Sequence, residues 1–107
     1  MRYEIVMTPG AARAFRALSA RRHAELRDAI EVHLRYEPTK VSKSRIRRLR
    51  GVTRPQYRLR VGDVRVFYDV SAMEVQVLAI VTKAEAQAWI ERKGAADESG
   101  GAGEGQG

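Results

Sequence analysis

The stretch YRLRVGDVRVFYDV, residues 57–70, constrains the fold of this chain more than any other segment. On both sides of Gly62-Asp63, valine, leucine and tyrosine alternate with arginine, phenylalanine and aspartate. This pair suits a two-residue turn, because glycine adopts the positive φ that the first turn position requires. The stretch therefore predicts a hairpin of two antiparallel strands, 56–61 and 64–70.

The predicted turn sets the register of the hairpin and gives it two unlike faces. The opposed pairs are Val61 and Val64, Arg60 and Arg65, Leu59 and Val66, Arg58 and Phe67, and Tyr57 and Tyr68. The valines, the leucine and the tyrosines form one face, which we expect to pack on helices. The other face carries Arg58, Arg60, Arg65 and Phe67.

Opposed arginines destabilise a sheet, so their presence needs a reason. Several fixed guanidiniums suit phosphate groups, and a neighbouring phenylalanine is placed to stack a base. We therefore interpret this face as an anion platform. The alternative is that Asp69, or the acids near the C-terminus, neutralise the arginines.

The charge of the chain is also concentrated around this hairpin. The net charge is +7, and residues 40–65 hold ten basic residues and one acid, Asp63. Such a concentration favours a polyanion or an acidic protein as partner, although a solvated surface is the alternative. The candidate RNA-binding residues are Lys43, Arg45, Arg47, Arg48, Arg50 and Phe67.

The remaining segments predict a small α+β domain of order β-α-α-β-β-β-α, with a helical hairpin packed on a mostly antiparallel twisted sheet. The predicted elements are a strand at 2–7, a helix capped by Thr8, a helix at about 20–36 capped by Ser19, a loop at 39–54 with at most one helical turn, a strand at 74–82 and a helix at 83–92.

The two ends of the chain differ in character. We expect residues 1–93 to form one domain and residues 94–107, which are rich in glycine and lack large apolar side chains, to form a disordered tail. There is no cysteine and no apolar run long enough to span a bilayer. We therefore expect a cytoplasmic protein without a membrane partner.

Four segments together resemble the RelE/ParE superfamily of type II toxin–antitoxin toxins. They are LRG at 49–51, the hairpin at 57–70, the strand VQVLAIV and the terminal helix. The resemblance covers residues 2–92 and implies the RelE-like fold, a cognate acidic antitoxin and a toxic activity. RelE-like members cleave mRNA on the ribosome, whereas ParE-like members poison DNA gyrase.

The resemblance also implies which residues form a nuclease site. Arg58 and Arg60 before the turn, and Arg65 after it, match the basic residues of the family. The segment TKAEAQAWI departs from the family, which usually has an arginine or histidine after the last strand and a tyrosine or histidine in the helix. Here Lys83 is the only basic residue, and Trp89 stands near the tyrosine position.

RNA cleavage by a 2′-hydroxyl requires a proton acceptor and a proton donor as well as charge stabilisation. Arginines supply only the last. We interpret His23 and His33 as packing or surface residues, and Asp63 and Asp69 as weak candidate bases. Lys83 is a candidate charge stabiliser, or a base if its neighbours depress its pKa. No motif implies a metal or an organic cofactor.

Three functions remain open on the sequence. The first is a ribosome-dependent mRNA interferase that inhibits translation, with Arg58, Arg60, Arg65 and Lys83 as its catalytic residues. The second is a gyrase-inhibiting toxin without nuclease activity. The third is a non-toxic basic binding module on the same fold.

Overall fold

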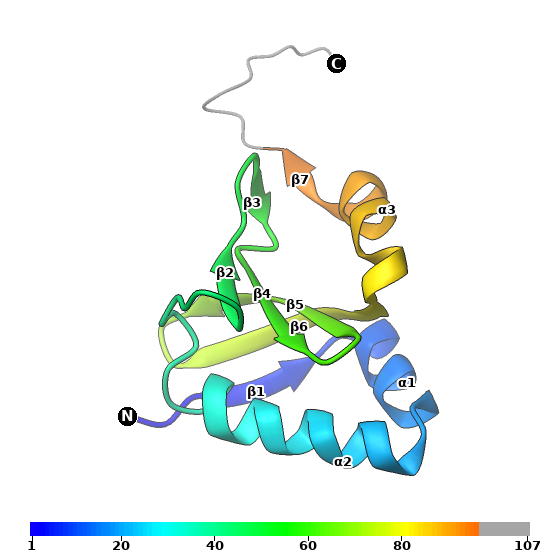
Figure 1. Ribbon diagram of the computed structural model, residues 1–107. Helices are drawn as coiled ribbons and strands as arrows, with labels where there is room; N and C mark the ends of the chain where they lie inside the picture. Colours follow the sequence, from blue (N-terminus) through cyan, green and yellow to red (C-terminus); the bar gives the residue numbers. More distant parts are fainter. Residues whose placement is uncertain (97–107) are drawn as a thin grey trace.

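The computed structural model describes residues 1–96 and confirms the expected α+β fold, with three short strands added. Helices α1 and α2 lie on one side of the sheet and α3 lies on the other (Figure 1). The elements are β1 (Glu4–Met7), α1 (Pro9–Ala17), α2 (Ala20–Ala29), the π-helix η1 (Ile30–Leu34), β2 (Ile46–Arg48), β3 (Val52–Arg54), β4 (Tyr57–Val61), β5 (Val64–Ser71), β6 (Glu74–Thr82), α3 (Lys83–Lys93) and β7 (Ala95–Ala96).

The main sheet has five strands in the order β1-β6-β5-β4-β2. Strand β1 runs parallel to β6, and the other neighbours are antiparallel. A parallel pair needs a long crossover between its strands, and everything from α1 to β5 supplies it here. In this order β6, β5 and β4 lie inside the sheet, and β1 and β2 are its edge strands.

The β4–β5 hairpin has the register that the sequence predicts. Tyr57 pairs with Tyr68, Arg60 with Arg65, and the three pairs between and beyond them follow. Gly62 has a φ of 58°, which glycine adopts without the Cβ strain that other residues incur. The turn chemistry alone therefore determines which side chains share a face.

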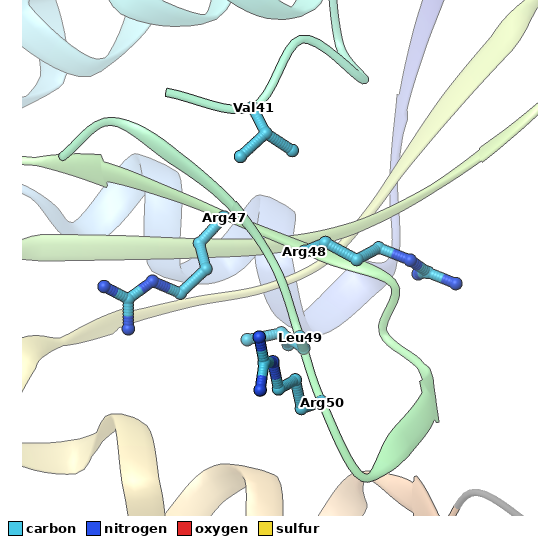
Figure 2. Close-up of a pocket in the computed structure, with 5 residues that line it drawn as sticks. All are labelled: Val41, Arg47, Arg48, Leu49 and Arg50. Carbon is cyan, nitrogen blue, oxygen red and sulfur yellow. The ribbon is translucent and has the colours of Figure 1, made fainter. Parts of the chain in front are cut away.

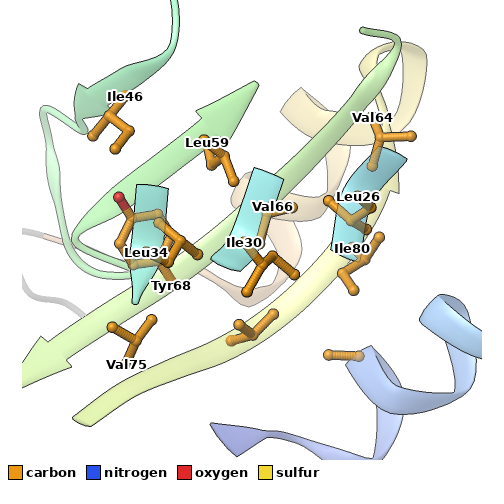
Figure 3. Packing of buried hydrophobic residues seen from close by; sticks show 12 residues of the cluster. Leu26, Ile30, Leu34, Ile46, Leu59, Val64, Val66, Tyr68, Val75 and Ile80 are labelled. Carbon is orange, nitrogen blue, oxygen red and sulfur yellow. The ribbon is translucent and has the colours of Figure 1, made fainter. Parts of the chain in front are cut away.

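The main core lies between this sheet and the helical hairpin. Leu26, Ile30 and Leu34 form the predicted stripe along one side of α2 and η1 (Figure 3). They pack on apolar side chains of the sheet, namely Ile46, Leu59, Val64, Val66, Tyr68, Val75, Val77 and Ile80. Each fully buried aliphatic side chain of this kind stabilises the fold by about 1.5–3 kcal/mol.

The helix starts are as predicted, but the second helix is not a single α-helix. Thr8 and Ser19 accept hydrogen bonds from backbone amides of the first turns. Helix α2 ends at Ala29 and a π-helical turn follows, in which the amide of Arg35 donates to the carbonyl of Ile30 over 3.1 Å. Residues spaced by four drift around an α-helix of 3.6 residues per turn. The wider π turn offsets this drift and keeps Leu34 over the sheet.

The prediction of a loop at residues 39–54 is wrong in part. Strand β2 lies within this segment and pairs with β4, and strand β3 pairs with β7. Ile46 is 3% exposed and inserts into the core beside Leu59. A single apolar residue among arginines gives no alternating pattern from which a strand could be predicted. Residues 46–48 form a strand because they pair with β4, not because of their local sequence.

The body of the protein also extends beyond the predicted boundary at residue 93. Gly94 caps α3, and Ala95–Ala96 form β7, which pairs with β3. A Cβ on Gly94 would lie 2.6 Å from the carbonyl oxygen of Ile90 and 3.3 Å from Val52, so this position needs glycine. The rest of the predicted disordered tail, residues 97–107, lies outside the described residues.

Candidate functional site

The arginine face is the most highly charged part of the sheet. Strand β2 places Arg47 directly beside Arg58 of β4, and β5 places Arg65 directly opposite Arg60. Four arginines from three adjacent strands therefore occupy one face, which we call the arginine face. Three of them belong to the predicted hairpin, and Arg47 lies in the segment for which the sequence predicts a loop.

Arg58 lies at the centre of this face and is the least satisfied member. Its Nε is buried without a hydrogen-bond partner among residues 1–96, and its Nη2 donates to the carbonyl of Ser44 over 3.4 Å. Burial lowers the pKa of Arg58, and the charges of Arg47, Arg65 and Arg60 lower it further. A buried donor without an acceptor destabilises the free protein by about 1–3 kcal/mol. A bound anion would offset the repulsion between Arg58 and its three arginine neighbours.

Arg65 is mostly buried, unlike its partner Arg60. Arg65 is 7% exposed, and its Nη1 donates to the carbonyls of Gly62 and Val64 over 2.8 and 3.2 Å. The buried guanidinium therefore stabilises the hairpin turn through these two hydrogen bonds. Arg60 is exposed and faces solvent. Of the predicted phosphate-binding arginines, Arg58 and Arg60 are available for contact, while Arg65 acts through its charge.

The expectation that Phe67 stacks a nucleobase is wrong. Phe67 is fully buried and stacks on Trp89 of α3, with ring centroids 5.1 Å apart and an angle of 6° between the rings. Helix α3 thus covers the β5 end of the arginine face. The sequence placed Phe67 on the correct face but did not indicate that α3 would cover it.

Asp69 does not neutralise the arginine face. Its carboxylate accepts a hydrogen bond from the amide of Gln56 over 2.8 Å and pairs with Nε of Arg54 over 3.0 Å. Both partners precede β4 in the chain, so Asp69 connects the segment before β4 to β5. Within residues 1–96, the alternative in which Asp69 pairs with Arg65 is therefore wrong.

The other predicted basic residues are divided between two regions. Arg45 lies at the start of β2, where its carbonyl accepts the amide of Arg60 over 2.8 Å. Lys43 is exposed in the preceding bend. Arg48 instead projects to the opposite face, over the ring of Tyr57 at 5.1 Å from its centroid. Lys83 is exposed at the start of α3, and its amide donates to the carbonyl of Asp63 over 2.8 Å.

A hollow of about 700 Å³ lies along the outer side of β2. Figure 2 shows Arg47 and Arg48 leaving this segment in opposite directions, with Val41 facing the strand across the hollow. The lining residues are Val41, Arg47, Arg48, Leu49 and Arg50. Arg47 therefore belongs both to the arginine face and to this hollow, and it links the two.

The candidate proton-transfer groups have contacts of their own, and both histidines belong to the helical hairpin on the opposite side of the sheet. His23 stacks on Phe15 with ring centroids 4.1 Å apart. His33 belongs to η1 on the opposite side of the sheet, and burial together with Arg45 lowers the pKa of its imidazole. Asp63 pairs with Arg22 over 3.8 Å. The interpretation of both histidines as packing residues agrees with these contacts.

Two kinds of site are missing from residues 1–96. No three His, Cys, Asp or Glu side chains of this part of the chain come together in a way that suits a metal ion. None of its helices combines the length and the apolar character that a transmembrane segment needs.

Comparisons with known proteins agree with this architecture. No protein-family model matches the chain, and no curated protein matches it in sequence. Among solved structures, it is similar to a chain of the archaeal RelE-RelB complex from Pyrococcus horikoshii, with a TM-score of 0.64 and 24% identity over 78% of this chain and 97% of that one. It is also similar to a chain of the toxin–antitoxin complex RelBE2 from Mycobacterium tuberculosis, with a TM-score of 0.60 and 25% identity over 77% and 99% of the two chains. These neighbours confirm the resemblance that the hairpin carries, and the chain has the fold of a RelE-like toxin.

Proposed function

We propose that this chain is the toxin of a type II toxin–antitoxin pair and acts as a ribosome-dependent mRNA interferase that inhibits translation in the cytoplasm. The observation that carries the proposal is the state of Arg58 on a RelE-like fold. Its guanidinium has a buried Nε without a partner among residues 1–96 and lies among three other arginines. An RNA phosphate beside this guanidinium would supply the missing negative charge.

In this proposal the arginines act on the scissile phosphate. Cleavage by a 2′-hydroxyl places added negative charge on the phosphate oxygens in the transition state, and fixed guanidiniums stabilise that charge. Arg58 and Arg60 contact the phosphate, while the buried Arg65 adds positive charge to the site without touching the RNA. Lys83, whose amide donates to the carbonyl of Asp63 at the hairpin turn, is the proposed charge stabiliser or base.

The proposed partner is an acidic antitoxin. Both structural neighbours belong to toxin–antitoxin complexes, and this chain has a net charge of +7. An acidic segment that covers the arginine face would block RNA and would also relieve the repulsion between the arginines.

A gyrase poison without nuclease activity is the second candidate. The engagement of Asp69 by Arg54, and of Asp63 by Arg22, favours it, because both weak candidate bases already have cationic partners. In that case the arginine face would contact an acidic surface of gyrase rather than RNA.

Induction of the chain in growing cells distinguishes these functions. Pulse-labelling measures protein and DNA synthesis in the same culture, and primer extension maps cuts in mRNA. The proposal expects protein synthesis to fall first and cuts to appear only in translated messages. A prior fall in DNA synthesis would support the gyrase poison, and unchanged synthesis of both would support a non-toxic binding module.

A further inference from the structure

The outer edge of β2 has backbone groups that no strand pairs. Strand β2 ends the main sheet. The amide of Arg60 donates to Arg45, and the amide of Leu49 donates to Gln56, so residues 45, 47 and 49 direct their backbone groups toward β4. Ile46 and Arg48 therefore direct theirs outward.

These two outward positions differ in one respect. The outward backbone groups of Ile46 are already hydrogen-bonded to Ser42. The Ser42 amide donates to the Ile46 carbonyl over 2.9 Å, and the Ser42 hydroxyl accepts a hydrogen bond from the Ile46 amide over 3.2 Å. The segment around Ser42 thus covers the first half of the edge. The amide and carbonyl of Arg48 lie beyond this cover, and Arg48 is one of the residues that line the hollow beside β2.

The hollow combines apolar contact with positive charge. Val41 is 56% exposed, and the half-buried Leu49 lines the same hollow. Arg47 and Arg50 line the same hollow, and no carboxylate of residues 1–96 is within 4.0 Å of either guanidinium. Arg48 is held by the carbonyl of Gln56 over 3.0 Å and by the ring of Tyr57.

We propose that this edge is a docking site for an extended acidic peptide of a partner protein. The peptide adds as a short strand at Arg48, inserts an apolar side chain between Val41 and Leu49, and places carboxylates on Arg47 and Arg50. The proposal goes beyond the antitoxin contact proposed above, because it concerns the edge of β2 rather than the arginine face, and it holds whether or not the chain cuts RNA.

A peptide fits the hollow better than a nucleic acid does. Single-stranded nucleic acids are bound chiefly by stacking of bases on aromatic rings, with guanidinium planes as a second platform. No residue that lines the hollow is aromatic. Two aliphatic side chains spaced along an open strand edge suit the alternating side chains of an extended peptide instead.

Fluorescence anisotropy of the full chain with two labelled peptides tests the site. In the first probe, a capped heptapeptide, glutamate alternates with valine and leucine. In the second, serine replaces the apolar residues, so the charge is the same. We expect Val41→Ser and Arg50→Ala each to weaken the first probe by about fivefold or more. Val32→Ser and Arg13→Ala are the matched controls, because Val32 is 64% exposed on η1 and Arg13 is exposed on α1.

Hydrogen exchange of the Arg48 amide provides the second measurement. We expect it to slow when the first probe binds, and to remain unchanged with the serine probe at the same concentration. Equal affinity for the two probes, an unaffected Val41→Ser variant, or an unchanged Arg48 amide would each overturn the proposal. It would also be overturned if Val41→Ser weakened a single-stranded RNA hexanucleotide while the peptide bound as before.

Discussion

Arg60 and Arg65 face each other across the hairpin, yet they occupy different environments. Arg60 is exposed, whereas Arg65 is buried against the turn carbonyls. The same residue type at neighbouring positions of one face therefore has two roles. The exposed arginine is available to a ligand, and the buried one holds the hairpin together and contributes charge.

Arg60→Ala should separate function from stability. We expect the free energy of unfolding to stay the same or to rise by up to about 1 kcal/mol, because the change removes a directly opposed like charge. Toxicity should be lost, and RNA affinity should fall by about 1–3 kcal/mol. Denaturant melts and RNA titrations measure these effects. Arg13→Ala on α1 is the control, and an Arg60→Ala variant as toxic as the parent would exclude the arginine face as the site.

Arg65→Ala should instead destabilise the domain. The variant loses two hydrogen bonds from a charged donor to the carbonyls of Gly62 and Val64, each of which is worth about 1.5–3 kcal/mol at most. Relief of repulsion with Arg58 and Arg60 offsets part of the loss, so we expect a net cost of about 1–3 kcal/mol in denaturant melts. An unchanged or higher free energy of unfolding would contradict the role assigned to the buried guanidinium.

At the scale of the elements, two contacts between residues far apart in the sequence attach the ends of helices to strands. Strand β7 pairs with β3, and Arg35 at the end of η1 donates to the carbonyl of Tyr3 while pairing with Glu31. Each contact fastens the end of a helix to a strand. Each also gives a measurable prediction.

Truncation should show where the folded body ends. Removal of residues 97–107 should change the free energy of unfolding by no more than about 0.5 kcal/mol, since that segment has no large apolar side chain. Removal of residues 94–107 also deletes β7 and the cap of α3, so we expect a lower thermal midpoint. Equal midpoints for the two truncated proteins would show that β7 adds no stability.

The Glu31–Arg35 pair should contribute to the acid sensitivity of the fold. The hydrogen bond from Arg35 lowers the pKa of Glu31 below its ordinary value. Stability from this pair is therefore complete above the ordinary carboxyl pKa and is lost as the pH falls toward the lowered value. Glu31→Gln should cost about 0.5 kcal/mol at pH 7, since the pair is partly exposed. The difference between variant and parent should shrink in urea melts as the pH falls below the ordinary carboxyl pKa toward the lowered value, and a constant difference would contradict this.

At the scale of the whole molecule, positive charge is concentrated on one end of the sheet. Strand β2 brings Arg47 into register with the hairpin arginines, while the helical hairpin covers the opposite face of the sheet. The molecule thus has a packed face and a charged face. Helix α3 covers only the β5 side of the charged face, through the Phe67–Trp89 stack.

Partner binding should therefore depend strongly on salt. If an acidic antitoxin covers the arginine face, its affinity should fall steadily as the salt concentration is raised from about 0.05 to 0.5 M, because screening weakens contacts between exposed charges. Calorimetric titration at several salt concentrations measures this. An affinity that does not change over this range would indicate an apolar contact elsewhere on the molecule.

The hairpin shows how much of the fold was predictable. Its register follows from local chemistry, because Gly62-Asp63 selects a tight turn and the side chains of a strand alternate in direction. The caps at Thr8 and Ser19 and the stripe at Leu26, Ile30 and Leu34 are local in the same sense. The sequence by itself therefore determined the α+β class, the order of the helices and of the four strands that it predicts, and the shared face of Arg58, Arg60 and Arg65.

Only the tertiary structure decided what that face can do. Burial of Phe67 under Trp89 depends on where α3 folds back, and the position of Arg47 depends on the pairing of β2 with β4. The exposure of Arg60 and the burial of Arg65 depend on the same long-range contacts. A pattern of alternation gives the direction of a side chain, but it does not tell which other segment will cover it, because that choice is made by packing between segments distant in the chain.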